Sequence, residues 1–320
     1  MLKRFSLFLQ QSLIIIINYN IMEKLHGIVV PMVTPLILNA EIDYKATEKL
    51  VEHLISGGVH GIFVLGTTGE AQSLSTVQRE SFVEFVGKQI NGRTRYIVGV
   101  SDTSIADSVK LATAAQAAGA EGVVATPPYY FAPSQSDMVN WFTALADASP
   151  LPVYMYNMPS HVKVNIDPAT VAKLSLHPNI KGLKDSSHNM TYFQTLSYLT
   201  RDEEDFVLFV GPEEQTAQAV LLGGAGGVNG GANMFPELYV KSYNAAVAGD
   251  LETVKKCQKA ILHISTAIYN VGGYLPSLKG ALELLGLCGR TLALPYTAMS
   301  EDKMPALKEA LAGISAQEWN

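Results

Sequence analysis

The sequence predicts an α/β fold, a (β/α)8 TIM barrel with a C-terminal helical appendage. From Gly27 onward, short apolar runs rich in β-branched residues alternate with stretches of helical periodicity. The apolar runs number eight and lack strict alternation, which is typical of strands buried on both faces of a parallel sheet. Eight strand–helix units over about 220 residues agree with the number of units and the length of a (β/α)8 barrel.

The predicted strands follow one another at nearly even spacing along the chain. They are Ile28–Val33, Ile62–Leu65, Tyr96–Val100, Gly122–Ala125, Val153–Tyr156, Ile180–Leu183, Phe206–Val210 and Gly227–Asn229. The rival fold is a doubly wound open sheet. No GxGxxG motif follows the first run and the spacing has no central break, so the closed barrel is favoured.

Helices are predicted between these runs. Phe82, Val86 and Ile90 recur at intervals of four and share one helical face. Asp167-Pro168 is typical of an N-cap followed by proline at the first helical position. Left-handed glycines are expected to end three of the helices, at Gly58, Gly119 and Gly223.

The alternation stops after about Ala248, and the remainder is predicted to form two or three helices, roughly 250–286 and 302–314. We therefore divide the chain into a barrel over residues 22–249 and C-terminal helices over 250–320. Residues 1–21 are interpreted as an upstream extension. Their apolar run is interrupted by polar residues and lacks a small-residue cleavage site, so a signal peptide is the less favoured alternative.

Composition favours a globular enzyme that acts on a small molecule. Of the 320 residues, 48% are hydrophobic and 16% are charged, and the formal net charge is -6. An acidic chain has no general attraction to nucleic acid or to an anionic membrane surface. The two cysteines, Cys257 and Cys288, form no CxxC pair, and such sparse cysteine fits the reducing cytoplasm.

Barrel chemistry is expected at the carboxyl ends of the strands, where Lys184 is the first candidate. A lysine within an apolar barrel strand points into a packed interior, and burial favours the neutral amine. A neutral amine can attack a ketone and form a Schiff base. The alternative is a structural lysine that pairs with Asp185 or extends from the strand end.

Three other strand ends supply further candidates. Tyr156 ends the strand before that of Lys184, so its phenol could transfer protons there, or it could be an ordinary core tyrosine. Thr67 and Thr68 lie between glycines and could hold a carboxylate through hydroxyl and N–H groups, or simply form a turn. The glycine-rich stretch 223–231 allows close approach of a substrate to backbone, or only tight packing.

Several other enzyme classes lack their motifs here. The sequence contains no HExxH, no GxSxG and no P-loop. A metal-dependent hydrolase, a serine hydrolase of that type and a P-loop nucleotide hydrolase are therefore disfavoured.

Taken in order, Gly66-Thr67-Thr68-Gly69-Glu70, Tyr154–Pro159 and Gly182–Ser186 resemble the dihydrodipicolinate synthase/N-acetylneuraminate lyase family of class I pyruvate aldolases. The resemblance covers residues 24–316. It implies that Lys184 forms the Schiff base, that Tyr156 and Thr67 relay protons, and that Thr68 with its backbone holds the pyruvate carboxylate. It also implies that Tyr130 completes the relay in a neighbouring subunit of a homotetramer built as a dimer of dimers. No metal and no organic cofactor is implied.

One position departs from the synthase branch of the family. An arginine that binds the carboxylate of aspartate semialdehyde is expected after the YNxP motif, and His161 stands in its place. Histidine lacks the planar fork that binds a carboxylate through two bonds. Lys184-Asp185-Ser186-Ser187 looks more like the branches that cleave 2-keto-3-deoxy sugar acids or 4-hydroxy-2-oxo acids.

We therefore expect a cytoplasmic Schiff-base lyase or aldolase of pyruvate-type 2-oxo acids, which cleaves a 2-keto-3-deoxy sugar acid, a 4-hydroxy-2-oxo acid or a sialic acid. We expect no nucleic-acid or membrane partner. Gly69, Glu70, His161, Asn229 and Asn233 are expected to contact the substrate, on position alone. The alternatives are 4-hydroxy-tetrahydrodipicolinate synthase, a dehydratase or deaminase of the same family, and a non-catalytic binder of 2-oxo acids.

Overall fold

Eight parallel strands close into a barrel in chain order, with β8 hydrogen-bonded to β1. The computed structural model describes residues 24–314 and Trp319, so the interpretation of residues 1–21 lies outside the described residues. The strands are β1 (Gly27–Pro31), β2 (Gly61–Val64), β3 (Arg95–Gly99), β4 (Gly122–Ala125), β5 (Val153–Asn157), β6 (Ile180–Asp185), β7 (Val207–Val210) and β8 (Gly226–Gly227). The predicted barrel is confirmed, with strand ends within two residues of those expected.

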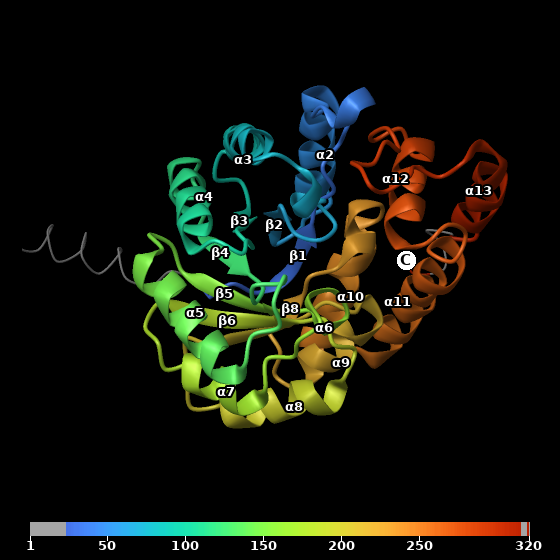
Figure 1. Ribbon diagram of the computed structural model, residues 1–320. Coiled ribbons are helices and arrows are strands. Elements are labelled where there is room, and N and C mark those ends of the chain that lie inside the picture. Colours follow the sequence, from blue (N-terminus) through green and yellow to red (C-terminus); the bar gives the residue numbers. More distant parts are fainter. Residues whose placement is uncertain (1–23, 315–318, 320) are drawn as a thin grey trace, which may run out of the picture.

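Helices surround the strands, and the last three helices lie to one side of the barrel, in orange and red in Figure 1. Those of the barrel are α2 (Tyr44–Ser56), α3 (Thr76–Ile90), α4 (Ile105–Ala117), α5 (Gln135–Ala148), α6 (Pro159–Val162), α7 (Pro168–Leu174), α8 (Met190–Leu199), α9 (Thr216–Leu221) and α10 (Pro236–Ala248). The C-terminal appendage contains α11 (Leu251–His263), α12 (Tyr274–Leu284) and α13 (Met304–Ala312). Within residues 24–314, no helix has the length and apolar character of a membrane span.

Most helix ends follow the local rules read from the sequence. The three glycines expected to end helices, Gly58, Gly119 and Gly223, have φ of 75°, 84° and 90°. Asp167 is the N-cap and Pro168 begins α7, as predicted, although the Asp167 side chain makes no capping hydrogen bond. A proline at the first helical position leaves one fewer N–H to satisfy, which reduces the need for a cap.

The barrel encloses a small apolar core of its own. Inward side chains from six strands form it, namely Val29, Phe63, Ile97, Val124, Tyr156 and Phe209, with Leu25 and Val228 at the ends. Side chains on the outer face of the strands pack instead against the helices. Because side chains alternate along a strand, Lys184 faces inward between Leu183 and Asp185, in register with Tyr156 and Phe209. The fold therefore directs one lysine into an aromatic-lined interior.

Candidate active site

Lys184 lies near the carboxyl end of β6, and only 8% of its surface is exposed. Its Nζ stands 4.1 Å from the centroid of the Tyr156 ring and 5.5 Å from that of Phe63. Among the described residues, no carboxylate pairs with this amine. Asp185 bonds instead to the Asn157 amide at 2.9 Å and to Ser187. The structural alternative of a Lys184–Asp185 pair is thus absent from the described part of the chain.

The Tyr156 phenol lies between this amine and the β2 turn. Its burial acts to raise the pKa, but the charge of Lys184 and hydrogen bonds with Thr67, Ser186 and Lys184 outweigh burial, so the Tyr156 pKa lies below its ordinary value. The Thr67 Oγ1 is 3.5 Å from the phenol oxygen, which is long for a hydroxyl pair. Such contacts often tighten only when substrate binds. The arrangement suits proton transfer beside an amine.

The β2 turn presents free backbone donors. The Gly69 N–H bonds to Gly66 O and the Glu70 N–H to Thr67 O, each at 3.1 Å, which closes the turn. The N–H groups of Thr67 and Thr68 have no acceptor among the described residues. Adjacent unpaired N–H groups and hydroxyls form a concave site for an anion. This is the geometry expected for a carboxylate site.

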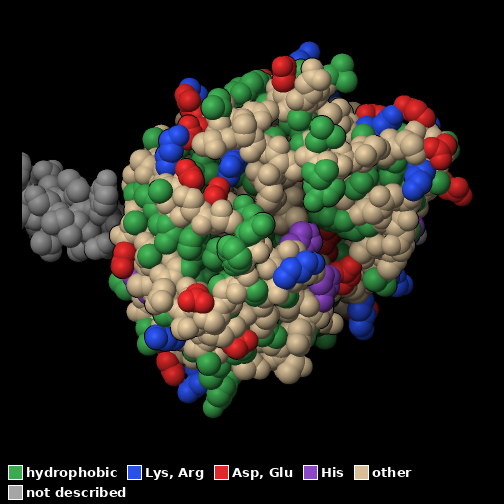
Figure 2. Space-filling view, viewed as in Figure 1, with side chains coloured by type: hydrophobic (Ala, Val, Ile, Leu, Met, Phe, Trp, Pro, Cys, Tyr) green, Lys and Arg blue, Asp and Glu red, His purple; other side chains and the backbone are tan. Residues whose placement is uncertain are grey.

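These groups line a cavity of about 410 Å³. Ser265, Glu214, His188 and His161 also line this cavity. Figure 2 shows a hollow at the centre of this face with histidine, lysine and acidic side chains at its rim. Burial lowers the pKa of His161, and the charges of nearby lysines, including Lys184, lower it further. His161 is therefore largely neutral near pH 7.

The cavity brings together five of the residues expected from the sequence. They are Lys184, Tyr156, Thr67, Thr68 and His161. Tyr130 does not line this cavity: its side chain is 83% exposed, and its ring centroid is 5.1 Å from that of the exposed Phe131. Its expected role in a neighbouring subunit remains a prediction.

The expected substrate contacts of Asn229 and Asn233 stay predictions, and both amides are hydrogen-bonded within the protein. The Asn229 amide is fully buried and bonds to the Thr216 hydroxyl at 2.9 Å. The Asn233 amide is also fully buried, accepts from the Val33 N–H and donates to Pro31 O and Gly230 O. Both side chains form hydrogen bonds that stabilise loops, and neither lines the cavity of Lys184.

Glu70 and Gly69 are also bonded within the protein. The Glu70 carboxylate pairs with Lys279 at 2.5 Å, with both side chains 0% exposed, and accepts from the Ala293 N–H at 2.8 Å. Glu70 lines a neighbouring cavity rather than that of Lys184. The Gly69 carbonyl accepts from the Thr34 hydroxyl at 2.7 Å. Both residues stabilise the turn, and their expected contacts with substrate stay predictions.

Sequence reasoning missed three residues that form the site. Ser186 bonds with the Tyr156 phenol and directly follows the β6 strand, a position that could have singled it out. Gly211 must lack a side chain, since a Cβ there would lie 2.0 Å from Ser186 Oγ and 3.3 Å from Lys184 Cε. Tyr274, from α12, bonds to Thr68 at 2.9 Å, and no strand-end rule points to it.

A buried strand-six lysine beside a tyrosine and a hydroxyl turn defines a class of barrel enzyme, the Schiff-base lyases of class I aldolase type. Comparison with known proteins agrees. Residues 24–314 match the model of the Dihydrodipicolinate synthetase family, and the chain belongs to that family. Its members are aldolase-type pyruvate enzymes, so the expected class of function is confirmed.

Relatives match along almost the whole chain. The 4-hydroxy-tetrahydrodipicolinate synthase of Hyphomonas neptunium is 35% identical over 292 residues, 91% of this chain and 99% of that protein. The enzyme of the same name from Methanospirillum hungatei is 33% identical and covers 89% of this chain and 98% of that protein.

Solved structures also match along almost the whole chain. Dihydrodipicolinate synthase of Bacteroides thetaiotaomicron is 46% identical, with a TM-score of 0.88, over 91% of this chain and 99% of that chain. YagE, an E. coli K12 prophage protein of the dihydrodipicolinic acid synthase family solved with pyruvate, is 27% identical, with a TM-score of 0.86, over 90% of this chain and 98% of that one.

Proposed function

We propose that the chain is a pyruvate aldolase that cleaves a 2-keto-3-deoxy sugar acid, a 4-hydroxy-2-oxo acid or a sialic acid. The observation that supports this most directly is the Lys184 amine, buried without a carboxylate partner among the described residues and standing over the Tyr156 ring. An unpaired buried amine costs stability, and it is suited to attack a ketone.

The chemistry follows from the positions of these groups. The N–H and hydroxyl groups of Thr67 and Thr68 hold the 2-oxo acid carboxylate. The Lys184 amine adds to the C2 ketone and water leaves, while Tyr156 transfers the protons, which gives an iminium. Loss of the C4 hydroxyl proton then breaks the C3–C4 bond, an aldehyde leaves and the bonding electrons form an enamine. Protonation at C3 and hydrolysis release pyruvate and the free amine.

The other residues that line the cavity favour a substrate whose distal half carries hydroxyl groups. Among the described lining residues, Lys184 is the one lysine or arginine. A second carboxylate would meet Glu214 and the largely neutral His161, without a guanidinium to bind it. Hydroxyl groups can instead bond to Ser265, Glu214 and His161.

The second candidate is 4-hydroxy-tetrahydrodipicolinate synthase, which joins pyruvate to aspartate semialdehyde. The names of the relatives and the 46% identical structure favour it. Against it stands His161 at the position where the synthase branch carries its carboxylate-binding arginine.

A substrate panel separates these functions. Purified protein is given 2-keto-3-deoxy sugar acids, 4-hydroxy-2-oxo acids and N-acetylneuraminate, and pyruvate release is followed with lactate dehydrogenase. We expect kcat/KM for one of these cleavages to exceed that for condensing pyruvate with aspartate semialdehyde. The opposite order would identify a synthase. Loss of water or ammonia from C4 without cleavage would identify a dehydratase or deaminase.

A His161→Arg variant helps to distinguish these functions, because it introduces the arginine that the synthase branch carries at this position. It should improve use of aspartate semialdehyde relative to the hydroxylated substrates. Turnover on no substrate, together with equal 2-oxo acid binding by wild type and Lys184→Ala, would favour a non-catalytic binder. The proposed chemistry needs neither a metal nor an organic cofactor, because the iminium itself accepts the electrons. Activity should therefore survive EDTA.

We also propose a homotetramer of the cytoplasm. Tyr130 and Phe131 are 83% and 82% exposed, and exposed neighbouring aromatics are typical of an interface. Cys257 and Cys288 are free and buried, which fits a reducing compartment. Analytical ultracentrifugation tests the assembly, and Tyr130→Phe should lower turnover if this phenol completes a neighbour's relay.

A further inference from the structure

The C-terminal appendage reaches into the active site through the first residue of α12. The Tyr274 phenol lies 2.9 Å from the Thr68 hydroxyl, on the turn that offers its N–H groups to the carboxylate. Tyr274 lines both the Lys184 cavity and the neighbouring cavity. The barrel supplies Thr68, but a residue outside the barrel completes its hydrogen bonding.

The surroundings of Tyr274 are shaped to hold its phenol in this place. A Cβ on Gly230 would lie 2.0 Å from the Tyr274 oxygen, so glycine is required there. The Tyr269 ring packs edge-on against it, with centroids 4.9 Å apart. Tyr269 in turn donates to the buried Glu213 carboxylate at 2.9 Å. The Tyr274 side chain is therefore held by the Tyr269 ring as well as by the hydrogen bond of its hydroxyl.

A second contact ties α12 to the same turn. Lys279, five residues along the helix, forms the fully buried ion pair with Glu70 at 2.5 Å. Glu70 has φ of 56°, a left-handed conformation that a residue with a Cβ adopts at some cost. The ion pair joins α12 to the end of the turn that follows Thr68.

Resting on the proposed function, we propose that Tyr274 is a positioning residue for the carboxylate of the 2-oxo acid. Its phenol donates to Thr68 Oγ1, and the Thr68 hydroxyl proton is then left to bond the carboxylate. Burial raises the pKa of Tyr274 and the negative Glu213 raises it further, so the phenol remains a donor. Tyr274 acts through Thr68 and need not touch the reacting carbon.

A double-mutant cycle tests this role. Tyr274→Phe removes one oxygen and keeps the ring against Tyr269. We expect its KM for the 2-oxo acid to rise roughly three- to tenfold, the range for one lost hydrogen bond, with kcat little changed. Thr68→Val should raise KM at least as much, and the double variant no further. Thr68→Ser keeps the hydroxyl and should restore most of the affinity.

Tyr296→Phe is the matched control, since Tyr296 lines the neighbouring cavity and is 57% exposed. Its KM should match wild type. An unchanged KM in Tyr274→Phe, or effects of Tyr274→Phe and Thr68→Val that multiply, would overturn the proposal. Failure of wild type to form a borohydride-reducible adduct would instead overturn the proposed function, so the two failures are distinguishable.

Discussion

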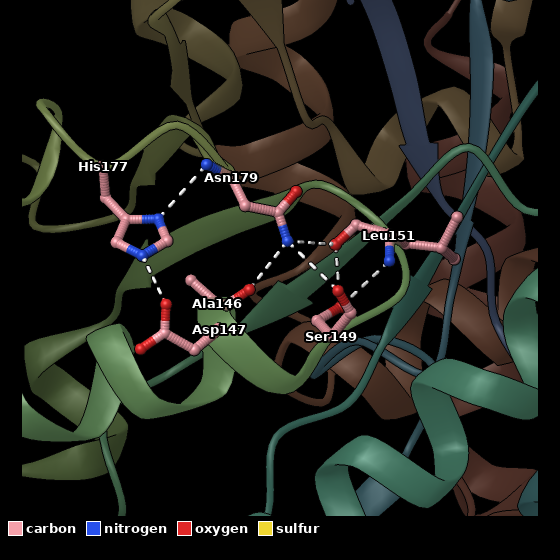
Figure 3. Close-up of polar contacts among 6 residues, drawn as sticks. All are labelled: Ala146, Asp147, Ser149, Leu151, His177 and Asn179. Carbon is pink, nitrogen blue, oxygen red and sulfur yellow. Dashed lines mark hydrogen bonds and ion pairs between the residues drawn. The ribbon is translucent and has the colours of Figure 1, made fainter.

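Asn179, just before β6, and Lys184, near the end of β6, differ in how far their polar groups are satisfied. Before the strands begin, the Asn179 amide donates to three carbonyls, those of Ala146 at 2.8 Å and of Ser149 and Leu151 at 3.2 Å (Figure 3). Near the end of β6, the Lys184 amine has no carboxylate partner among the described residues and lies 4.1 Å from the centroid of the Tyr156 ring. The contact between the Tyr156 phenol and the Thr67 hydroxyl is long, at 3.5 Å.

The difference teaches where the barrel gains stability and where it keeps reactive groups. Satisfied hydrogen bonds at the amino ends fix the strands, and leaving their acceptors unpaired would cost stability. At the carboxyl ends, groups left partly unsatisfied remain available to a substrate. Substitutions at one end should therefore change stability, and at the other end activity.

The largest effect is expected from Lys184→Ala. Turnover should fall to background, because no other amine lines the described cavity. The melting temperature should hold or rise, since a buried unpaired amine is removed. Lys181→Ala is the control on the same strand, because Lys181 pairs with Asp205 at the surface. A variant of Lys184 that keeps turnover would break the comparison.

Tyr156→Phe should come next. Loss of a proton-transferring group typically costs about 10²- to 10⁴-fold in rate, so kcat should drop by that order while the fold is kept. Tyr154→Phe, two residues earlier on β5, is the control: burial raises the Tyr154 pKa to about 12, and its phenol lies outside the cavity. Steady-state kinetics on the best substrate measure both. Equal losses in the two variants would argue for a packing role.

Asn179→Ala changes a residue just before β6 and should lower stability while activity is kept. The Ala146 and Ser149 carbonyls lose the Asn179 donor, while the Leu151 carbonyl keeps the Ser149 hydroxyl at 2.7 Å, so the free energy of unfolding should fall by about 2 to 3 kcal/mol. Because the site lies at the other end of the strands, kcat should stay near wild type. Urea denaturation and initial rates on the same preparation give both quantities. A large loss of kcat with unchanged stability would contradict the division.

The smallest effect belongs to Asp147→Asn. Asp147 pairs with the His177 ring at 3.1 Å, beside the Asn179 network, but its side chain is 68% exposed. Exposed ion pairs contribute about 0 to 1 kcal/mol, so stability should change by less than in Asn179→Ala. Thermal melts at low and high salt provide the measurement. A loss equal to that of Asn179→Ala would show that the ion pair, rather than the amide, fixes this loop.

Sequence periodicity was enough to predict the barrel, because the patterns that indicate strands and helices involve residues close together in the sequence. Lys184 was found for the same reason, as a charge within an apolar strand. For Asn229 and Asn233, position at a strand end did not reveal that each amide is already hydrogen-bonded within the protein. Tyr274 was missed because its contact joins residues 206 positions apart.

The central claim is that Lys184 forms a Schiff base with a 2-oxo acid. Wild type and Lys184→Ala are each mixed with pyruvate, reduced with sodium borohydride and weighed by intact mass spectrometry. The account predicts one pyruvate-derived adduct on wild type, mapped by peptide digestion to Lys184, and none on the variant. An unmodified wild type, or an equal adduct on Lys184→Ala, would contradict it.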